Sequence, residues 1–415
     1  MKKTILFILI FSLIFIFSTQ FSRAAEKDGG PRYFVKSTSG FWKNALGARH
    51  VFEEEGGFTA DISDFQVGLA RIFGLEIEPV DLLHILPTEV NKKPEVAGKP
   101  TTRLTPTDQT PWGIEAVYNN LLLTQTSGGA GINVAVLDTG VLRTHPDLKS
   151  RIAQCKDFST RSSFVEDKCD DKNGHGTHVS GTILADGGSD HLGVYGVAPE
   201  AKLFAYKVCG NDGSCWADDI QVALKTAADQ GANVVNMSLG ADVDSSFIRN
   251  GITYAVGKGV LVVAAGGNDG PYASSIDYPG ANASVVSVGS VDNLLKVSDW
   301  SSRGINSTTT AEIIEEKDME FAAPGVNVES TWKNGGYMVL SGTSMATPHI
   351  TGLAAKLWQT PLAGSTSTAA TLTRAYLKSL VFDVIEKVTP DAGGITDDVG
   401  VGEDNGSGYG FPRLP

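Results

Sequence analysis

An aspartate, a histidine and a serine, which together can carry out nucleophilic catalysis, each lie next to a predicted strand, turn or helix that would hold the side chain in place. Asp138 directly follows an apolar run, His175 lies among glycines, and Ser344 precedes a helical stretch of small residues. A serine hydroxyl needs a neighbouring base, and that base needs a partner that fixes its tautomer and stabilises its charged form. The sequence therefore predicts acyl-transfer chemistry with these three residues as a catalytic triad.

Acyl transfer also creates an oxyanion, which must meet hydrogen-bond donors that are already in place. Asn268 follows the apolar residues 262–265 within a Gly-Gly-Asn-Asp-Gly sequence, and its side-chain amide is a suitable donor. The backbone N–H of Ser344, near a predicted helix N-terminus, is the natural second donor. A nucleotide-binding turn is the alternative for this glycine-rich segment, but its glycine spacing does not fit the dinucleotide fingerprint.

Apolar runs that alternate with helical stretches must position these groups. Strands are predicted at 132–137, 203–208, 234–239, 260–265 and 285–288, and helices at 217–230 and 246–258. This alternation predicts a doubly wound α/β domain with a parallel sheet and helices on both faces. Ligands of such domains bind beyond the carboxyl ends of the strands, where Asp138 and Asn268 are expected.

The N-terminal part of the chain is organised differently. Residues 1–24 read as an export signal, with two lysines, an apolar run and small residues at its end, and an uncleaved membrane anchor is the alternative. A small α+β segment is expected over 25–90, with strands at 33–36, 58–75 and 82–86 and a helix at 42–55. A polar linker open to proteolysis follows at 91–106, and the catalytic domain spans 107–415.

Charge and cysteine content narrow the possible partners. The 415-residue chain has a formal net charge of −13 and shows no clustered basic face, which argues against nucleic acid as a partner. Export makes the four cysteines candidates for disulfides, and the local pairs Cys155–Cys169 and Cys209–Cys215 are favoured among three possible pairings. A zinc site at Cys169, His175 and His178 is the competing hypothesis, but no matching second half exists.

A family resemblance rests on four motifs in a fixed order. They are Leu137-Asp138-Thr139-Gly140, Asn173-Gly174-His175-Gly176-Thr177-His178, Gly266-Gly267-Asn268-Asp269-Gly270 and Ser341-Gly342-Thr343-Ser344-Met345-Ala346. The chain from about residue 107 onward resembles the subtilisin-like serine proteases, or subtilases. This resemblance implies a secreted endopeptidase of broad specificity that cleaves protein or peptide substrates. More weakly, 25–90 resembles the inhibitory propeptide of a self-processing zymogen.

The resemblance also implies a substrate groove and a calcium site. Ser238, Leu239 and Gly240 match one wall of the groove, Gly213 and Ser214 match the opposite strand, and Gly267 matches part of the pocket before the scissile bond. A peptide would be held between the two strands by main-chain hydrogen bonds. The implied structural calcium ligands are Asp108, Asp147, Gly188, Asp190, Leu192 and Val194. A solvated acidic loop is the alternative for the calcium residues.

Two carboxylates give the predicted substrate pocket an unusual charge. By resemblance, Asp269 lies on its rim and Asp277 at its base, where many family members carry a small or neutral residue. Two carboxylates in one cleft repel each other, and a bound Lys or Arg would relieve that repulsion. We therefore expect the pocket to accept basic residues, unless the side chains point to solvent or bind a cation. Arg103 followed by Leu104 is a compatible self-cleavage site.

Three functional hypotheses follow. The first is a secreted, monomeric serine endopeptidase that is not bound to a membrane once its signal is cleaved. The second is a catalytically silent binding module, which would be expected to lack a triad residue or Asn268, and none is missing. The third is a membrane-tethered protease, which would keep residues 1–24.

Overall fold

The chain forms two compact units, Met1–Val80 and Asp81–Pro415, which are described separately. The structure is a computed structural model that describes residues 31–86, 103–160, 164–306, 309–310, 313–363, 365–382 and 404–415. The predicted export signal and most of the predicted linker lie outside these ranges. In the described part of the chain, no helix is both long and apolar enough to cross a bilayer.

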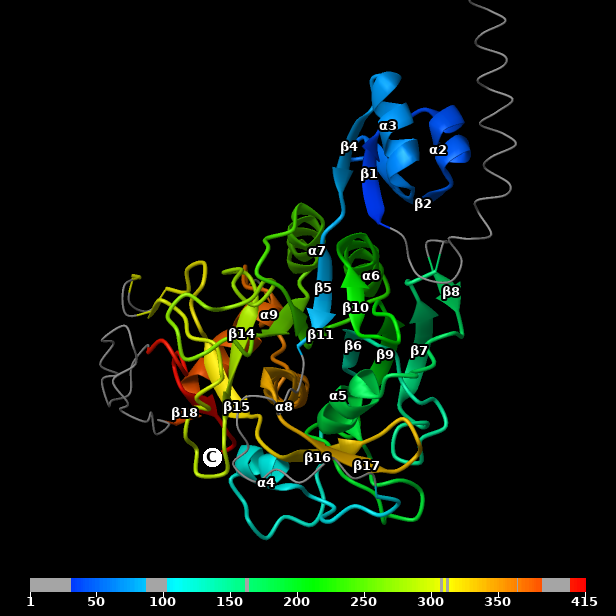
Figure 1. The fold of residues 1–415 in the computed structure, drawn as a ribbon. Helices are drawn as coiled ribbons and strands as arrows, with labels where there is room; N and C mark the ends of the chain where they lie inside the picture. Colours follow the sequence, from blue (N-terminus) through cyan, green and yellow to red (C-terminus); the bar gives the residue numbers. More distant parts are fainter. Residues whose placement is uncertain are drawn as a thin grey trace, which may run out of the picture. The chain divides into compact units, whose positions relative to one another are not determined.

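The first unit is a four-stranded antiparallel sheet with two helices (Figure 1). Its strand order is β2-β3-β1-β4. The strands are β1 (Arg32–Lys36), β2 (Ala48–Phe52), β3 (Gly57–Asp61) and β4 (Glu76–Pro79), and the helices are α2 (Gly40–Leu46) and α3 (Asp64–Ile72). Buried Val35, Phe58 and Ile77 lie in its core. The α+β architecture agrees with the prediction for this segment.

Two element assignments in this unit were wrong. The predicted helix at 42–55 ends early because Gly47 takes a left-handed conformation, and strand β2 follows it. The predicted strand at 58–75 ends at Asp61, where helix α3 replaces it after a short connection. A capping box between Ser63 and Gln66 starts that helix, and local capping of this kind outweighs a short apolar pattern.

The second unit is built around an eight-stranded sheet in which only β8 runs antiparallel to its neighbour. The strand order is β15-β14-β13-β11-β6-β9-β7-β8. In chain order the strands are β6 (Asn133–Asp138), β7 (Ile152–Asp157), β8 (Val165–Glu166), β9 (Lys202–Lys207), β11 (Val234–Met237), β13 (Leu261–Ala265), β14 (Val286–Val291) and β15 (Phe321–Pro324). The predicted α/β fold class is confirmed, with the five predicted strands at the centre of the sheet.

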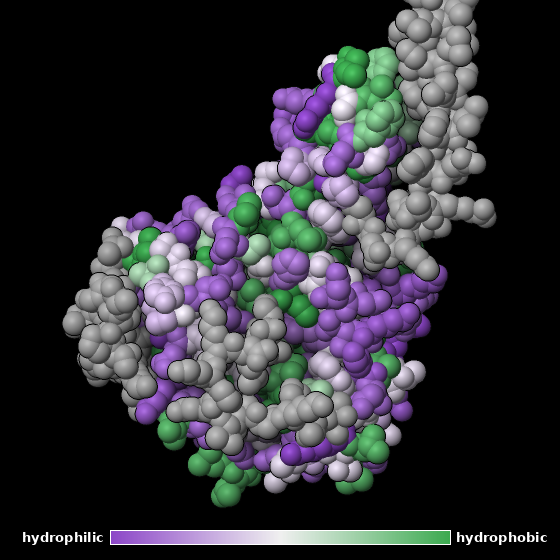
Figure 2. All heavy atoms as spheres, viewed as in Figure 1, coloured by the Kyte–Doolittle hydropathy of each residue, from purple (hydrophilic) through white to green (hydrophobic). Residues whose placement is uncertain are grey.

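Helices cover both faces of this sheet (Figure 1). Helix α6 (Ala217–Asp229) packs against α7 (Ser246–Gly257), and α5 (His175–Leu184) packs against α8 (Thr343–Lys356). Smaller elements are α4 (Trp112–Tyr118), α9 (Ala369–Ser379), the hairpin β16 (Val328–Thr331) and β17 (Tyr337–Leu340), and the pair β18 (Val381–Phe382) and β19 (Phe411–Pro412). On the face in Figure 2, hydrophilic side chains cover much of this unit and hydrophobic ones form separate patches.

A separate three-stranded sheet brings together segments that are far apart in the sequence. Strand β5 (Leu82–Ile85) lies between β10 (Ser214–Trp216) and β12 (Leu239–Gly240) and pairs antiparallel with both. The N–H of Ile85 donates to the carbonyl of Gly213 at 2.9 Å. This sheet lies entirely in the second unit, although β5 belongs to the N-terminal segment predicted from sequence.

Both predicted disulfides are present. Cys155 bonds to Cys169, and Cys209 bonds to Cys215. The first joins β7 to the segment that precedes α5, and the second closes the short loop between β9 and β10. Cys169 is therefore occupied, which contradicts the alternative of a zinc site with His175 and His178.

Candidate active site

The acid and the base of the predicted triad meet at the carboxyl end of β6. Asp138 is the last residue of this strand, and His175 is the first residue of α5. Nδ1 of His175 lies 2.8 Å and 2.9 Å from the two carboxylate oxygens of Asp138, and both side chains are buried. This contact places the ring N–H on Nδ1 and leaves Nε2 as the basic nitrogen.

Glycine permits the close approach of these two segments. A Cβ atom at Gly176 would lie 2.2 Å from the carbonyl oxygen of Gly140, within the loop that follows Asp138. Asp171 joins the same segments, since its carboxylate accepts hydrogen bonds from Thr139 and from the backbone N–H of Gly174. Asp171 was not predicted from the sequence, because a single acid in a polar loop has no distinctive pattern.

Ser344 is the second residue of α8, and its position depends on Ser238. The Ser344 hydroxyl donates to the Ser238 carbonyl at 3.0 Å, while the Ser238 hydroxyl donates to the Ser344 carbonyl at 2.9 Å. That carbonyl has no helical partner, because Pro348, four residues later, lacks an N–H. Ser238 therefore satisfies the group that the proline leaves unpaired and fixes the start of the helix.

The N-terminus of α8 also orients Asn268. The side-chain oxygen of Asn268 accepts hydrogen bonds from the backbone N–H and the hydroxyl of Thr343, each at 3.0 Å. This places the Asn268 amide nitrogen on the side of the group away from Thr343. Because Ser344 is in the first turn of α8, its own N–H has no partner within the helix. Both predicted oxyanion donors therefore belong to the segments that meet at this helix start.

Nε2 of His175 is buried and has no hydrogen-bond partner in the structure. The Ser344 hydroxyl is directed to Ser238 instead. Catalytic hydrogen bonds are often long or misaligned in structures without substrate and tighten in the reacting complex.

Strand β5 pairs with both of the strands that are predicted to form the groove. Ser214 pairs with His84, and Cys215 pairs with Leu83. On the other side Gly240 also pairs with His84, and Leu239 pairs with Ile85. An extended segment of the chain thus lies between the two walls predicted to hold a peptide, with antiparallel main-chain pairing on each side.

Three carboxylates meet beside this groove. Ligand oxygens of Asp242, Asp269 and Asp277 all lie within 4.8 Å of one another, and only Asp277 is buried. Asp277 also packs against the groove wall, because a Cβ atom at Gly240 would lie 2.8 Å from its Cβ, and one at Gly267 would lie 2.9 Å from its Oδ2. Burial, followed by the charges of Asp269 and Asp242, raises the pKa of Asp277 to about 7. Asp269 and Asp277 were predicted from the sequence, and Asp242 was not.

The predicted calcium loop surrounds a buried carboxylate with an unsatisfied oxygen. Oδ2 of Asp147 accepts hydrogen bonds from the N–H of Val194 at 3.0 Å and the hydroxyl of Tyr337 at 2.9 Å. Oδ1 is buried without a partner. A Cβ atom at Gly188 would lie 3.1 Å from this Oδ1 and 3.3 Å from Oδ1 of Asp190, so both carboxylates face that glycine. Burial raises the pKa of Asp147.

Asp108 differs from the other predicted calcium ligands. Among the described residues, no group of carboxylates within 4.8 Å joins Asp108 to Asp147 and Asp190. The Asp108 carboxylate accepts the N–H of Thr110 at 3.0 Å. The side chain from this segment that reaches the loop is Gln109, which contacts the carbonyls of His191 and Gly193.

The remaining histidines of the motifs have structural partners. Nε2 of His145 contacts the Gly336 carbonyl, Nε2 of His178 contacts the carbonyls of Val328 and Met338, and Nδ1 of His349 contacts the Met345 carbonyl. Burial lowers the pKa of His178 to about 3 and that of His349 to about 4, so both are neutral at pH 7.

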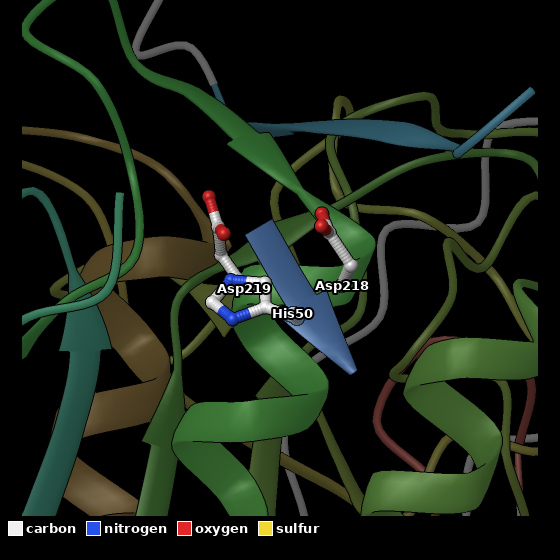
Figure 3. A group of neighbouring side chains, drawn as sticks. All are labelled: His50, Asp218 and Asp219. Atoms are coloured by element: carbon white, nitrogen blue, oxygen red, sulfur yellow. The ribbon is translucent and has the colours of Figure 1, made fainter. Parts of the chain in front are cut away.

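Asp218 and Asp219 lie in the first turn of α6 (Figure 3), where negative charge is favoured by the helix dipole. The third side chain drawn in Figure 3, His50, belongs to β2 of the first unit. We assign no metal site to this group.

Comparison with known proteins gives concordant matches over most of the chain. The model of the subtilase family matches residues 129–410. A protein named subtilisin, from Bacillus sp. (strain TA39), is 44% identical over 385 residues, which are 90% of this chain and 87% of that protein. Subtilisin BL from Lederbergia lenta is 42% identical over 251 residues, 60% of this chain and 84% of that protein.

Two solved structures are also similar. One, titled S41 psychrophilic protease, is 47% identical with a TM-score of 0.67, and the match covers 74% of this chain and 99% of that one. The other, sphericase, is 45% identical with a TM-score of 0.69, and the match covers 75% of this chain and all of that one.

Proposed function

The chain belongs to the subtilase family and is a serine endopeptidase, and from this premise we propose that Asp138, His175 and Ser344 are its catalytic triad. The observation that carries the proposal is the buried contact of His175 Nδ1 with both carboxylate oxygens of Asp138. Nε2 takes the proton of the Ser344 hydroxyl as its oxygen attacks the peptide carbonyl, and returns it to the leaving amine. Water then releases the acyl group, with His175 again as base.

The oxyanion of the tetrahedral intermediate is stabilised by the Asn268 amide and the Ser344 N–H. Two hydrogen bonds from Thr343 to the side-chain oxygen of Asn268 support this assignment, because they orient the amide before substrate binds. Preorganised donors of this kind act without a reorganisation cost at the moment of reaction. The dipole of α8 adds partial positive charge at the same place.

Extended peptides are the substrates, bound as a strand between β10 and β12. The pairing of β5 with both strands supports this assignment, because it satisfies main-chain groups along each wall. Recognition through main-chain groups tolerates many side chains, so specificity is broad. The pocket for the residue before the scissile bond is the exception to this broad specificity. It is lined by Asp277, Asp269 and Asp242, and it accepts Lys or Arg.

The protein is exported as a self-processing zymogen and acts as a monomer. Segment 25–90 serves as its inhibitory propeptide, and the place of β5 between the groove strands supports this role, because substrate cannot pair there at the same time. Arg103 pairs with Tyr337 through two backbone hydrogen bonds, so cleavage after Arg103 requires this bridge to open.

A structural calcium ion fits the loop at residues 187–194. The supporting observation is Oδ1 of Asp147, a buried acidic oxygen without a hydrogen-bond partner. Asp147 and Asp190 would supply carboxylate ligands, and Gly188, Leu192 and Val194 would supply backbone carbonyls. Gln109 replaces Asp108 as the expected ligand from the preceding segment. The ion would lock these segments together and takes no part in catalysis.

Labelling with a fluorophosphonate, followed by N-terminal sequencing of the labelled band, tests nucleophile and processing together. We expect label on Ser344 of a form that lacks residues 1–90. A silent binding module would take up no label. A tethered protease would keep residues 1–24 in its labelled form.

A further inference from the structure

We propose that the Cys209–Cys215 disulfide is a positioning element of the substrate groove, which holds β10 in the shape that binds extended peptides. The inference rests on the proposed function, since it assumes that β10 binds substrate. It assigns the disulfide a role in recognition rather than in overall stability.

One end of this disulfide lies in the groove wall itself. Cys215 is the middle residue of β10 and pairs with Leu83 of β5. Among the described strands, β10 has β5 as its only sheet neighbour. Apart from β5, the main-chain partner of β10 is the loop that the disulfide closes, through the antiparallel bridge of Cys215 with Cys209 and the N–H of Gly210, which donates to the Ser214 carbonyl at 2.8 Å. When no peptide occupies the groove, the extended shape of β10 therefore depends on how this loop is held.

The other end of the disulfide, Cys209, is hydrogen-bonded to residues at the ends of β6 and β9. The N–H of Cys209 donates to the carbonyl of Asp138 at 3.1 Å. The carbonyl of Cys209 accepts from the ammonium group of Lys207, a buried side chain that also donates to the Thr139 carbonyl. The disulfide thus links the groove wall covalently to Cys209, and hydrogen bonds hold Cys209 beside the strand end that presents the catalytic aspartate.

The loop between the two cysteines is rich in glycine. It contains Gly210 and Gly213, and Gly213 has a φ of 88°, so its backbone has more freedom than other residues would allow. The same Gly213 presents its carbonyl to Ile85. Ordering a flexible loop on binding costs affinity, and a covalent link that orders it beforehand removes part of that cost.

Cys155–Cys169 provides a matched control. It closes a longer loop, with a sequence separation of 14 against 6, and neither cysteine lies in β10, β12 or β5. Because disulfides restrict the unfolded chain more when their loops are longer, its loss should lower stability at least as much. A purely stabilising role therefore predicts similar or larger effects for the control pair.

The test compares two double variants of the mature enzyme, Cys209→Ala with Cys215→Ala and Cys155→Ala with Cys169→Ala. Each is assayed on a peptide anilide with four residues before the scissile bond and on an ester of a single amino acid, which does not reach β10. In the Cys209/Cys215 variant we expect the ratio of kcat/KM for the long substrate to that for the short one to fall roughly tenfold, mainly through KM. The control pair should keep the wild-type ratio.

An unchanged ratio in the Cys209/Cys215 variant, or an equal fall in both variants, would overturn the inference. If that variant fails to fold, the mature wild-type enzyme is partially reduced and alkylated, and mass mapping identifies molecules open at Cys209–Cys215 alone. The same fall in ratio is then expected. Loss of the proposed function would look different, because wild-type enzyme would then fail to hydrolyse even the short ester.

Discussion

At the residue scale, the hydroxyl of Ser344 donates to the carbonyl of Ser238, and Nε2 of His175 has no hydrogen-bond partner. Ser344 and Nε2 of His175 are therefore not hydrogen-bonded to each other in this structure. A buried basic nitrogen without a partner carries a desolvation cost, which a reacting serine or a bound substrate removes.

Replacement of Ser344 tests both the nucleophile and self-processing. We expect Ser344→Ala to lower peptide hydrolysis by on the order of 10⁴-fold or more, because no other group at the site forms the acyl-enzyme. Uncleaved precursor should accumulate, as judged by mass spectrometry of the purified protein. Normal maturation of the variant in a protease-free host would contradict self-processing, and full residual activity would contradict the triad.

The charge of Asp277 should make substrate preference depend on pH. Its raised pKa of about 7 means that the carboxyl group is neutral below that pH and charged above it. The ratio of kcat/KM for matched peptides with Arg or Phe before the scissile bond should therefore rise as pH increases from 6 to 8. We expect Asp277→Gly to lower this ratio several-fold at pH 8 and to flatten its pH dependence.

Asp299→Gly is the control for this substitution, because Asp299 is exposed and lies outside the carboxylate group. It should retain the wild-type ratio and its rise with pH. If Asp277→Gly leaves the Arg-to-Phe ratio unchanged at every pH, Asp277 does not contact the substrate residue and the assignment is wrong.

Site residues that lie in a distinctive local motif could be predicted from the sequence. Site residues that join the site only through long-range contacts could not. The contact between Asp138 and His175 follows from their positions at a strand end and a helix start. Asp242 joins Asp277 only through the fold, because a loop after β12 brings it there. The contact of Gln109 with the carbonyls of His191 and Gly193 was not predicted, because it joins residues more than 80 positions apart in the sequence.

At the element scale, fully buried parallel strands were predictable and edge elements were not. Strand β13 is a continuous apolar run, and β6 and β11 are fully or almost fully buried and mostly apolar, as expected for a sheet covered on both faces. Strand β7 escaped prediction because its sequence, IAQCKD, mixes polar and apolar residues near the sheet edge. Helix α3 depends on a capping box that the apolar pattern of its segment does not reveal.

The packing of α5 against the loop after β6 gives an element-scale prediction. Gly176→Ala would place a Cβ 2.2 Å from the Gly140 carbonyl, so one of the two backbones must shift. We expect a loss of stability of about 1–3 kcal/mol from overpacking, together with lower kcat/KM because α5 carries His175. Thermal melting and peptide assays of the purified mature variant measure both effects.

Gly257→Ala, at the end of α7, is the matched substitution. A Cβ there would meet nothing within 4 Å, so stability should be unchanged or raised by up to about 1 kcal/mol, and activity should not change. Equal stability and equal activity of the two variants would show that neither property depends on the close approach of Gly176 to Gly140.

At the scale of the whole molecule, segments remote in sequence complete single sites. The groove sheet joins β5, β10 and β12. The predicted calcium loop contacts Gln109 and Asp147, and Asp147 in turn accepts a hydrogen bond from Tyr337. Contacts of such long range form only when the domain is folded. An ion bound there would therefore report on, and stabilise, the folded state of the second unit as a whole.

Removal of calcium should therefore lower thermal stability more than it lowers activity. A ligand that binds only the native state stabilises it by about 2.7 kcal/mol when its concentration is 100 times the dissociation constant. For a unit of this size, such a change lowers Tm by roughly 4 °C on chelation. Melting curves in excess calcium and after prolonged dialysis against EDTA, with activity measured well below Tm, provide the comparison.

Asp147→Asn should show the low Tm in both conditions, because it weakens the carboxylate whose Oδ1 lacks a protein partner. The exposed Asp299→Asn should keep the calcium dependence of the wild type. Identical wild-type curves with and without calcium, in protein shown by elemental analysis to have lost its ions, would contradict the site. A calcium response that persists in Asp147→Asn would place the ion elsewhere, because the carboxylate at the centre of the loop would then be dispensable.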